Sequence, residues 1–144
     1  MQGTIILLVD DEAPFVETMT KRLTKRKLKI FSALNGKDAL KELGENSSIE
    51  IVLLDVKMPG IDGIETLQQI KKKYPLVEVI MLTGHATVES AIDGMKLGAF
   101  DYLMKPCDMD HLMAKVEEAV AKKRKHEEKI IEARVKEITS KRAY

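Results

Sequence analysis

The sequence IVLLDVKMPG, residues 51–60, decides how this chain is expected to fold. Its first four residues, 51–54, form an unbroken apolar run, which is typical of a strand covered on both faces inside a parallel sheet. Asp55 is the first charge after this run. Pro59 and Gly60 then end the strand, because proline lacks the ladder donor and glycine permits a turn. A carboxylate at the carboxyl end of such a strand lies where open α/β sheets bind ligands.

Short apolar runs and amphipathic segments alternate along the rest of the chain. The other predicted strands are residues 4–9, 28–34, 77–82 and 99–104. Between them, apolar side chains recur every three or four residues, as Phe15, Met19 and Leu23 do, which predicts helices. No proline or glycine follows Asp108, so the last helix is expected to be long. The pattern predicts an α/β fold with a doubly wound, flavodoxin-like five-stranded parallel sheet of order 2-1-3-4-5 and an extended C-terminal helix.

The composition indicates one domain that works in the cytoplasm. The chain has 144 residues, of which 44% are hydrophobic and 33% are charged, enough to bury one sizeable core. No apolar segment reaches the roughly 18 residues that a membrane span requires, and the first residues lack the basic region and cleavage site of a signal peptide. The single cysteine, Cys107, excludes an internal disulfide and a cysteine-based zinc site, which agrees with a reducing compartment.

Charge is distributed unevenly along the chain. From Ala121 onward there are nine Lys or Arg residues against four Glu residues, a net charge of +5. Since the whole chain has a net charge of +1, residues 1–120 carry −4. The acidic body suits a cation site, while the basic tail could contact a partner or be solvated.

Polar side chains follow four of the predicted strands at the point where each strand ends. The first strand ends in Asp10 and Asp11, the third in Asp55, the fourth in Thr83 and the fifth in Lys105. Because the carboxyl ends of parallel strands share one edge of a sheet, we expect these side chains to lie together. Three carboxylates in one place repel one another unless a hard cation such as Mg²⁺ holds them. An ammonium and a hydroxyl beside them would bind an anion, so the set predicts a site for phosphoryl transfer.

Four motifs carry these residues. They are VDDE at residues 9–12, LLDVKMPGIDGIE at 53–65, LTGHAT at 82–87 and GAFDYLMKP at 98–106. In this order and spacing they resemble the receiver domain of two-component response regulators. The resemblance covers about residues 4–120, and four motifs at successive strand ends are far more specific than any one of them.

The resemblance implies a role for each residue that matches a motif. Asp55 matches the aspartate that accepts a phosphoryl group from a sensor histidine kinase. Asp11 matches a direct ligand of Mg²⁺, and Asp10 matches the acidic partner that usually reaches the metal through water. Lys57 would supply its backbone carbonyl to the metal, and its side chain and that of His85 would flank the phosphoryl group and tune its lifetime.

Three further matches concern the response to phosphorylation. Thr83 matches the hydroxyl that bonds the phosphoryl group, and Lys105 matches its ammonium partner, with the Lys105–Pro106 peptide expected to be cis. Tyr102 lies at the position of the switch aromatic. The resemblance therefore implies a signalling module that is not an enzyme, and whose surface at the fourth helix and fifth strand changes when Asp55 is phosphorylated.

Other interpretations of the same residues remain open. Asp10 and Asp11 alone could mark a helix N-terminus favoured by the helix dipole, and Tyr102 could be a core residue. An alternative function is a Mg²⁺-dependent phosphatase or phosphotransferase with Asp55 as nucleophile, as in haloacid-dehalogenase-type hydrolases. Those enzymes typically place a second aspartate two residues after the first, where this chain has Lys57, and they need a cap for which the chain has little room.

The tail, residues 121–144, is expected to form a basic helical extension of a domain that comprises residues 1–120. A helix from residue 108 to the end would be about 55 Å long, more than a small domain is wide. Residues with coiled-coil spacing are Ile131, Val135, Ile138 and Arg142, but the seam is short. Three roles are open: a linker to an effector domain, a homodimerisation helix, and a nucleic-acid contact. The last is the weakest, because helix-turn-helix patterning is absent and basic residues 122–125 are more typical of a solvated face.

Overall fold

The structure is a computed structural model that describes residues 3–56, 62–84 and 88–142. Within these residues one sheet of five parallel strands has the order β2-β1-β3-β4-β5. Its strands are β1 (Ile5–Val9), β2 (Lys29–Ala33), β3 (Ile51–Leu54), β4 (Glu78–Thr83) and β5 (Asp101–Met104). The predicted fold class and strand order are therefore confirmed.

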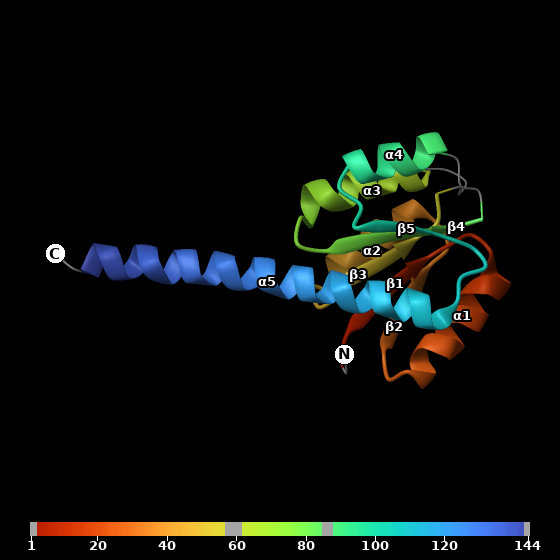
Figure 1. Cartoon of the computed structure of the whole chain (residues 1–144), viewed down its shortest axis with the longest axis horizontal. Coiled ribbons are helices and arrows are strands. Elements are labelled where there is room, and N and C mark those ends of the chain that lie inside the picture. The colour runs from red at the N-terminus through yellow and green to blue at the C-terminus, as the bar shows by residue number, and fades with distance from the viewer. Residues whose placement is uncertain (1–2, 57–61, 85–87, 143–144) are drawn as a thin grey trace.

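Helices cover both faces of the sheet, as Figure 1 shows. They are α1 (Ala13–Lys25), α2 (Gly36–Glu45), α3 (Gly63–Lys73), α4 (Val88–Lys96) and α5 (Met109–Arg142). The core on one face combines side chains of the sheet with α2 and α3, and the core on the other combines them with α1 and the first part of α5. The central strand β3 is completely buried at all four residues, as expected for a strand between two layers of helices.

The last predicted strand starts two residues later than expected. Residues 99 and 100 were assigned to it because they are apolar, but β5 begins at Asp101. The amide of Ala99 instead donates a hydrogen bond to the carbonyl of Gly94, so this residue completes the end of α4. Gly98 ends that helix with a φ of +102°, a conformation that glycine adopts without strain.

Local hydrogen bonds fix where two of the helices begin. The side chain of Asn35 accepts a hydrogen bond from the amide of Asp38 and caps α2, and Asp62 caps α3 in the same way by accepting from the amide of Glu65. Just inside α3, a Cβ at Gly63 would lie 2.2 Å from the carbonyl oxygen of Asp55. Glycine is thus required where the start of α3 crosses the end of β3.

Helix α5 has 34 residues, and Figure 1 shows that its distal half projects beyond the sheet. Its proximal part packs against the sheet through four buried residues, Leu112, Val116, Ala119 and Val120. From Glu132 to Ser140 every residue is exposed. None of the helices in the described part of the chain is both long and apolar enough to cross a membrane.

Candidate functional site

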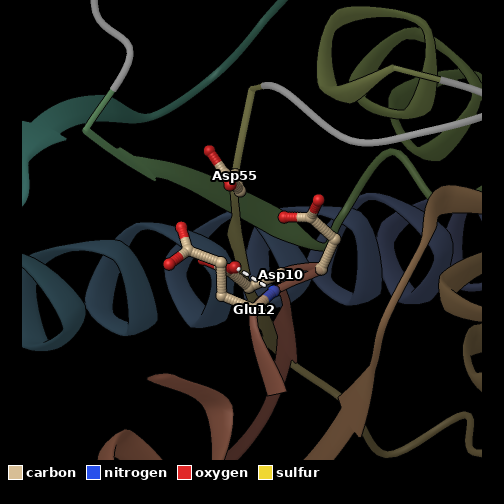
Figure 2. Close-up of side chains that lie close together, drawn as sticks. Asp10, Glu12 and Asp55 are labelled. Atoms are coloured by element: carbon tan, nitrogen blue, oxygen red, sulfur yellow. Dashed lines mark hydrogen bonds between the residues drawn. The ribbon is translucent and has the colours of Figure 1, made fainter. Parts of the chain in front are cut away.

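Four carboxylates meet at the carboxyl ends of β1 and β3. Asp10, Asp11, Glu12 and Asp55 each offer one oxygen atom, and these four atoms lie within 4.8 Å of one another. Figure 2 shows three of these side chains, Asp10, Glu12 and Asp55, close together. Asp10 and Asp55 are only 1% and 2% exposed, whereas Asp11 and Glu12 face solvent. The cluster thus has a buried half and a half that is open to an incoming ligand.

Sheet pairing brings these residues together. The amide of Asp55 donates to the carbonyl of Val9 at 2.9 Å, which continues the β1–β3 ladder by one step beyond the strands. The amide of Glu12 donates to Oδ1 of Asp10 at 2.9 Å, so the chain turns sharply from β1 into α1. Two acidic residues of the turn are consequently held beside the end of β3.

Glu12 was missing from the residues singled out in the sequence. It lies in the VDDE motif, but only Asp10 and Asp11 of that motif were assigned to the predicted metal site. A third consecutive carboxylate was the available signal, because the turn that begins α1 carries all three side chains past the same strand end.

Lys105 supplies a positive charge to this cluster. Its ammonium pairs with Oδ2 of Asp10 and lies 3.8 Å from Oδ2 of Asp55 and 3.8 Å from Oε1 of Glu12. The side chain is 14% exposed, so its charge is only weakly screened by water. The Lys105–Pro106 peptide is cis, as the family resemblance implies.

An aromatic ring lies on the other side of the Lys105 ammonium. Nζ of Lys105 is 3.9 Å from the centroid of the Phe15 ring, within the range of a cation–π interaction. Phe15 is the third residue of α1 and is partly buried against the core that contains α5. The sequence had suggested only a packing role for this residue.

Burial dominates the electrostatics of Asp10. Its pKa is raised above the ordinary value of 3.8, first because burial penalises the charged carboxylate. The hydrogen bond from Lys105 and that from the amide of Glu12 oppose this rise, and the nearby charge of Asp55 adds to it. A second cation in the cluster would therefore stabilise the ionised form of this carboxyl group.

Thr83 lies at the same edge, one strand away from Asp55. It is the last residue of β4 and is completely buried, and its carbonyl accepts a hydrogen bond from the amide of Lys105 at 2.9 Å. The ends of β4 and β5 are thereby joined next to the carboxylates. Two other residues from the sequence analysis, Lys57 and His85, lie outside the described residues.

Tyr102 occupies a different place from the other predicted site residues. It lies in β5 opposite Met81, and its ring packs against the core on the α2 and α3 face. Its hydroxyl is buried and has no hydrogen-bond partner among the described residues. Tyr102 is thus not part of the carboxylate cluster, and its hydroxyl has lost water without gaining a partner there.

The donor set fits a hard divalent cation. Carboxylate oxygens are the ligands that Mg²⁺ prefers, and three of the four acidic side chains also stand close enough to Lys105 to share its charge. Lys105 alone offsets one of several negative charges. The remaining excess of negative charge favours a bound cation at these strand ends.

Comparison with protein families and known proteins gives one consistent result. The model of the response regulator receiver domain matches residues 6–117. The DNA-binding transcriptional regulator NtrC of Escherichia coli (strain K12) is 36% identical over 121 residues, which are 84% of this chain and 26% of NtrC. The transcriptional regulatory protein ZraR of the same organism is 38% identical over 116 residues, 81% of this chain and 26% of ZraR. The chain spans about a quarter of the length of these relatives.

Solved structures agree with this result. A response regulator receiver domain protein from Clostridium thermocellum superimposes with a TM-score of 0.80 at 35% identity, covering 84% of this chain and 97% of that one. NtrX from Brucella abortus gives a TM-score of 0.82 at 29% identity, covering 89% of this chain and 29% of NtrX. The chain therefore belongs to the family of response regulator receiver domains of two-component signalling.

Proposed function

We propose that this receiver domain accepts a phosphoryl group on Asp55 from a sensor histidine kinase, with Mg²⁺ held at the carboxylate cluster. The observation that carries the proposal is the position of Lys105, whose ammonium pairs with Asp10 and lies 3.8 Å from Oδ2 of Asp55. A lysine placed there can bond an anion attached to Asp55 without leaving the carboxylates. Asp55 itself is only 2% exposed, so its charge is weakly screened by water.

Each residue of the cluster has a part in the proposed transfer. Asp10, Asp11 and Asp55 would hold Mg²⁺ together with the carbonyl of Lys57, and the bound ion would offset charge on the phosphoryl oxygens. An oxygen of Asp55 attacks phosphorus, the phosphorus–nitrogen bond to the kinase histidine breaks, and that histidine takes up a proton. Lys105 turns its ammonium toward a phosphoryl oxygen, which stabilises the negative charge that has arrived.

Thr83 and Tyr102 would couple phosphorylation of Asp55 to a change at the surface of the domain. A new anion on Asp55 attracts the hydroxyl of Thr83 from the neighbouring strand end. The hydroxyl of Tyr102 is buried and has no hydrogen-bond partner among the described residues, which supports a switch role, because a move that gave it a partner or water would be favourable. The surface formed by α4 and β5 would then differ between the two states.

A hydrolase is not favoured as the function of this site. The matching proteins are transcriptional regulators and receiver domains, and position 57, where a haloacid-dehalogenase-type enzyme carries its second aspartate, is a lysine. We propose that the domain turns over no substrate of its own and only assists its own phosphorylation and slow dephosphorylation. The domain would be located in the cytoplasm, a reducing compartment in which Cys107 stays a free thiol.

The C-terminal extension would connect the receiver domain to a partner. Residues 1–120 would form the receiver domain, and residues 121–144 would lead to an effector domain, as in longer regulators of the NtrC type. Ile131, Val135 and Ile138 are more than half exposed along one side of α5, so the extension could also pair with a second copy. Contact with a membrane or with nucleic acid is not assigned to this domain.

Intact-mass spectrometry after incubation with acetyl phosphate and Mg²⁺ tests this function. The proposal predicts a slowly decaying adduct of one phosphoryl group, about 80 Da, that does not form when Mg²⁺ is chelated before acetyl phosphate is added. The same sample should hydrolyse p-nitrophenyl phosphate no faster than buffer does. Steady turnover of that ester without a lasting adduct would instead support the phosphatase.

A further inference from the structure

Two buried carboxylates lie at the amino ends of central strands, whereas the proposed phosphoacceptor follows the carboxyl end of β3. Glu50 immediately precedes β3, and Glu78 is the first residue of β4. They are 9% and 3% exposed, and they are neighbours, because the amide of Glu78 donates to the carbonyl of Glu50 at 3.2 Å. Buried carboxylates without cationic partners are costly, so the residues that offset their charge are important for the fold.

Three consecutive residues of α5 provide most of that compensation. Arg124 donates from Nε and from a terminal guanidinium nitrogen to the two oxygens of Glu50, each at 3.2 Å. Lys123 lies 3.6 Å from the same carboxylate, and Lys122 lies 3.5 Å from Oε2 of Glu78. A two-pronged guanidinium–carboxylate contact restricts both distance and orientation, which a single ammonium contact does not.

Lys71 of α3 is a further cation beside Glu78, and it is already engaged. Its ammonium donates to the carbonyls of Pro75 and Val77, each at 2.9 Å, and lies 3.6 Å from Oε1 of Glu78. Burial lowers the pKa of Lys71, although the charge of Glu78 opposes that change. The other oxygen of Glu78 is buried and accepts no hydrogen bond from the described residues, so it depends on Lys122.

These contacts coincide with the place where hydrophobic packing of α5 ends. Val120 is the last buried residue of the helix, and most of the stability of helices in proteins comes from tertiary packing, which the residues after Val120 largely lack. Starting a helix is the costly step, and lengthening it is easier. Fixing residues 122–124 would therefore supply the ordered turn from which the rest of the extension continues.

We propose that Glu50 and Glu78 form an acidic docking site for residues 122–124, which anchors the extension as one continuous helix and fixes its direction relative to the domain. The docking site belongs to β3 and β4, whose far ends carry Asp55 and Thr83. An effector joined to α5 would thus be oriented by the two strands that present the candidate site. The basic start of the tail accordingly binds the domain itself, through Lys122, Lys123 and Arg124.

Hydrogen exchange on the full chain tests the proposal. The variant K122Q/R124Q removes two docked charges, and the matched control K125Q/K129Q removes the same charge from the same helix. Lys125 and Lys129 are exposed and have no ion pair in the described part of the chain. We expect amide protection of residues 125–142 to fall about tenfold or more in K122Q/R124Q and to stay unchanged in the control, while the sheet stays folded in both. Equal protection in the two variants would overturn the proposal.

A double-mutant cycle separates docking from general helix propensity. E50Q and R124Q should each weaken the protection of the extension, but the double variant should be little worse than either single one, because both remove the same contact. If the loss of protection in the double variant equals the product of the losses in the two single variants, the two side chains act independently, which would contradict the docking site. The proposal does not rest on phosphorylation, so the intact-mass adduct can form or fail without deciding this outcome.

Discussion

The ammonium of Lys105 lies 3.8 Å from Oδ2 of Asp55 while it pairs with Asp10. Lys105 is therefore shared between the carboxylate that would receive the phosphoryl group and a carboxylate that would hold the metal. Because an ammonium and a metal ion compete for Asp10, removing the lysine has opposite effects on the two ligands of the site.

For Lys105→Met we predict tighter Mg²⁺ binding and weaker binding of the phosphoryl mimic beryllofluoride. Loss of the ammonium leaves the carboxylates more negative, which should raise Mg²⁺ affinity about threefold to tenfold, a change of about 1 kcal/mol. Beryllofluoride affinity, measured by calorimetry at saturating Mg²⁺, should fall by about tenfold or more. Lys125→Met, on the exposed face of α5, is the control for net charge. Parallel loss of both affinities would mean that Lys105 only maintains the fold.

Phe15→Leu tests whether the aromatic ring positions Lys105. The variant keeps an apolar side chain of similar size but removes the ring face that lies 3.9 Å from Nζ. Cation–π contacts contribute roughly 0.5–2 kcal/mol, so beryllofluoride should bind about threefold or more weakly, and Phe15→Tyr should retain most of the affinity. Phe31→Leu changes a ring that faces Lys29 on β2 and should have no effect. Equal losses in Phe15→Leu and Phe15→Tyr would point to packing alone.

Gly63→Ala should destabilise the domain at the site itself. The added Cβ would lie 2.2 Å from the carbonyl oxygen of Asp55 and 2.5 Å from Cα of Val56, so backbone must move. We expect the free energy of unfolding in urea to fall by about 2–4 kcal/mol. At Gly44 in α2 the nearest atom is the Tyr74 hydroxyl at 3.5 Å, so Gly44→Ala should be neutral or stabilising by about 0.5–1 kcal/mol. Similar losses at both glycines would refute the close approach.

The contact between Asp101 and Lys115 predicts a specific dependence of stability on pH. Burial of Asp101 disfavours its charge, but the hydrogen bonds from Lys115, at 2.9 Å, and from the amide of Tyr102 outweigh it and lower its pKa below 3.8. A lowered folded-state pKa gives stability that is present above the unfolded value and lost as the pH falls through the folded one. Asp101→Asn should therefore cost up to about 1 kcal/mol at neutral pH.

The cost of Asp101→Asn should be constant from neutrality to about pH 4, and should shrink as the pH falls further through the lowered folded-state pKa, where the wild-type carboxylate becomes protonated. Urea midpoints of the two proteins at several pH values from neutrality to about pH 2 give the measurement. A difference that is constant across this range would show that the carboxylate stabilises the chain without its charge.

The apolar runs were sufficient to predict the sheet, because a strand buried on both faces leaves few other arrangements. The parallel strand order then predicts that Asp10, Asp11, Asp55 and Lys105 lie together at the carboxyl ends of the strands. Strand ends were less predictable, as Ala99 shows, since its amide completes a helix although its side chain is apolar.

Contacts between segments far apart in the chain could not be predicted from the sequence. Residues 122–125 were expected to be a solvated face, and Lys122, Arg124 and Lys125 are indeed exposed. The ion pairs that Lys122, Lys123 and Arg124 form with Glu50 and Glu78 were not expected. Nothing local to either glutamate identifies it as a partner of α5, because the pairing depends on which strand starts lie under that helix. The fourth carboxylate, Glu12, was missed for a related reason, since its position depends on the turn between β1 and α1.

The most direct test of the central claim is the position of the phosphoryl group in the full chain. After incubation with acetyl phosphate and Mg²⁺, borohydride reduction converts a phosphorylated aspartate into homoserine, which peptide mapping locates. The predicted result is homoserine at position 55 in the wild type and no labelled residue in Asp55→Asn. Homoserine at Asp10 or Asp11, or an unchanged amount of adduct in a folded Asp55→Asn protein, would contradict the assignment.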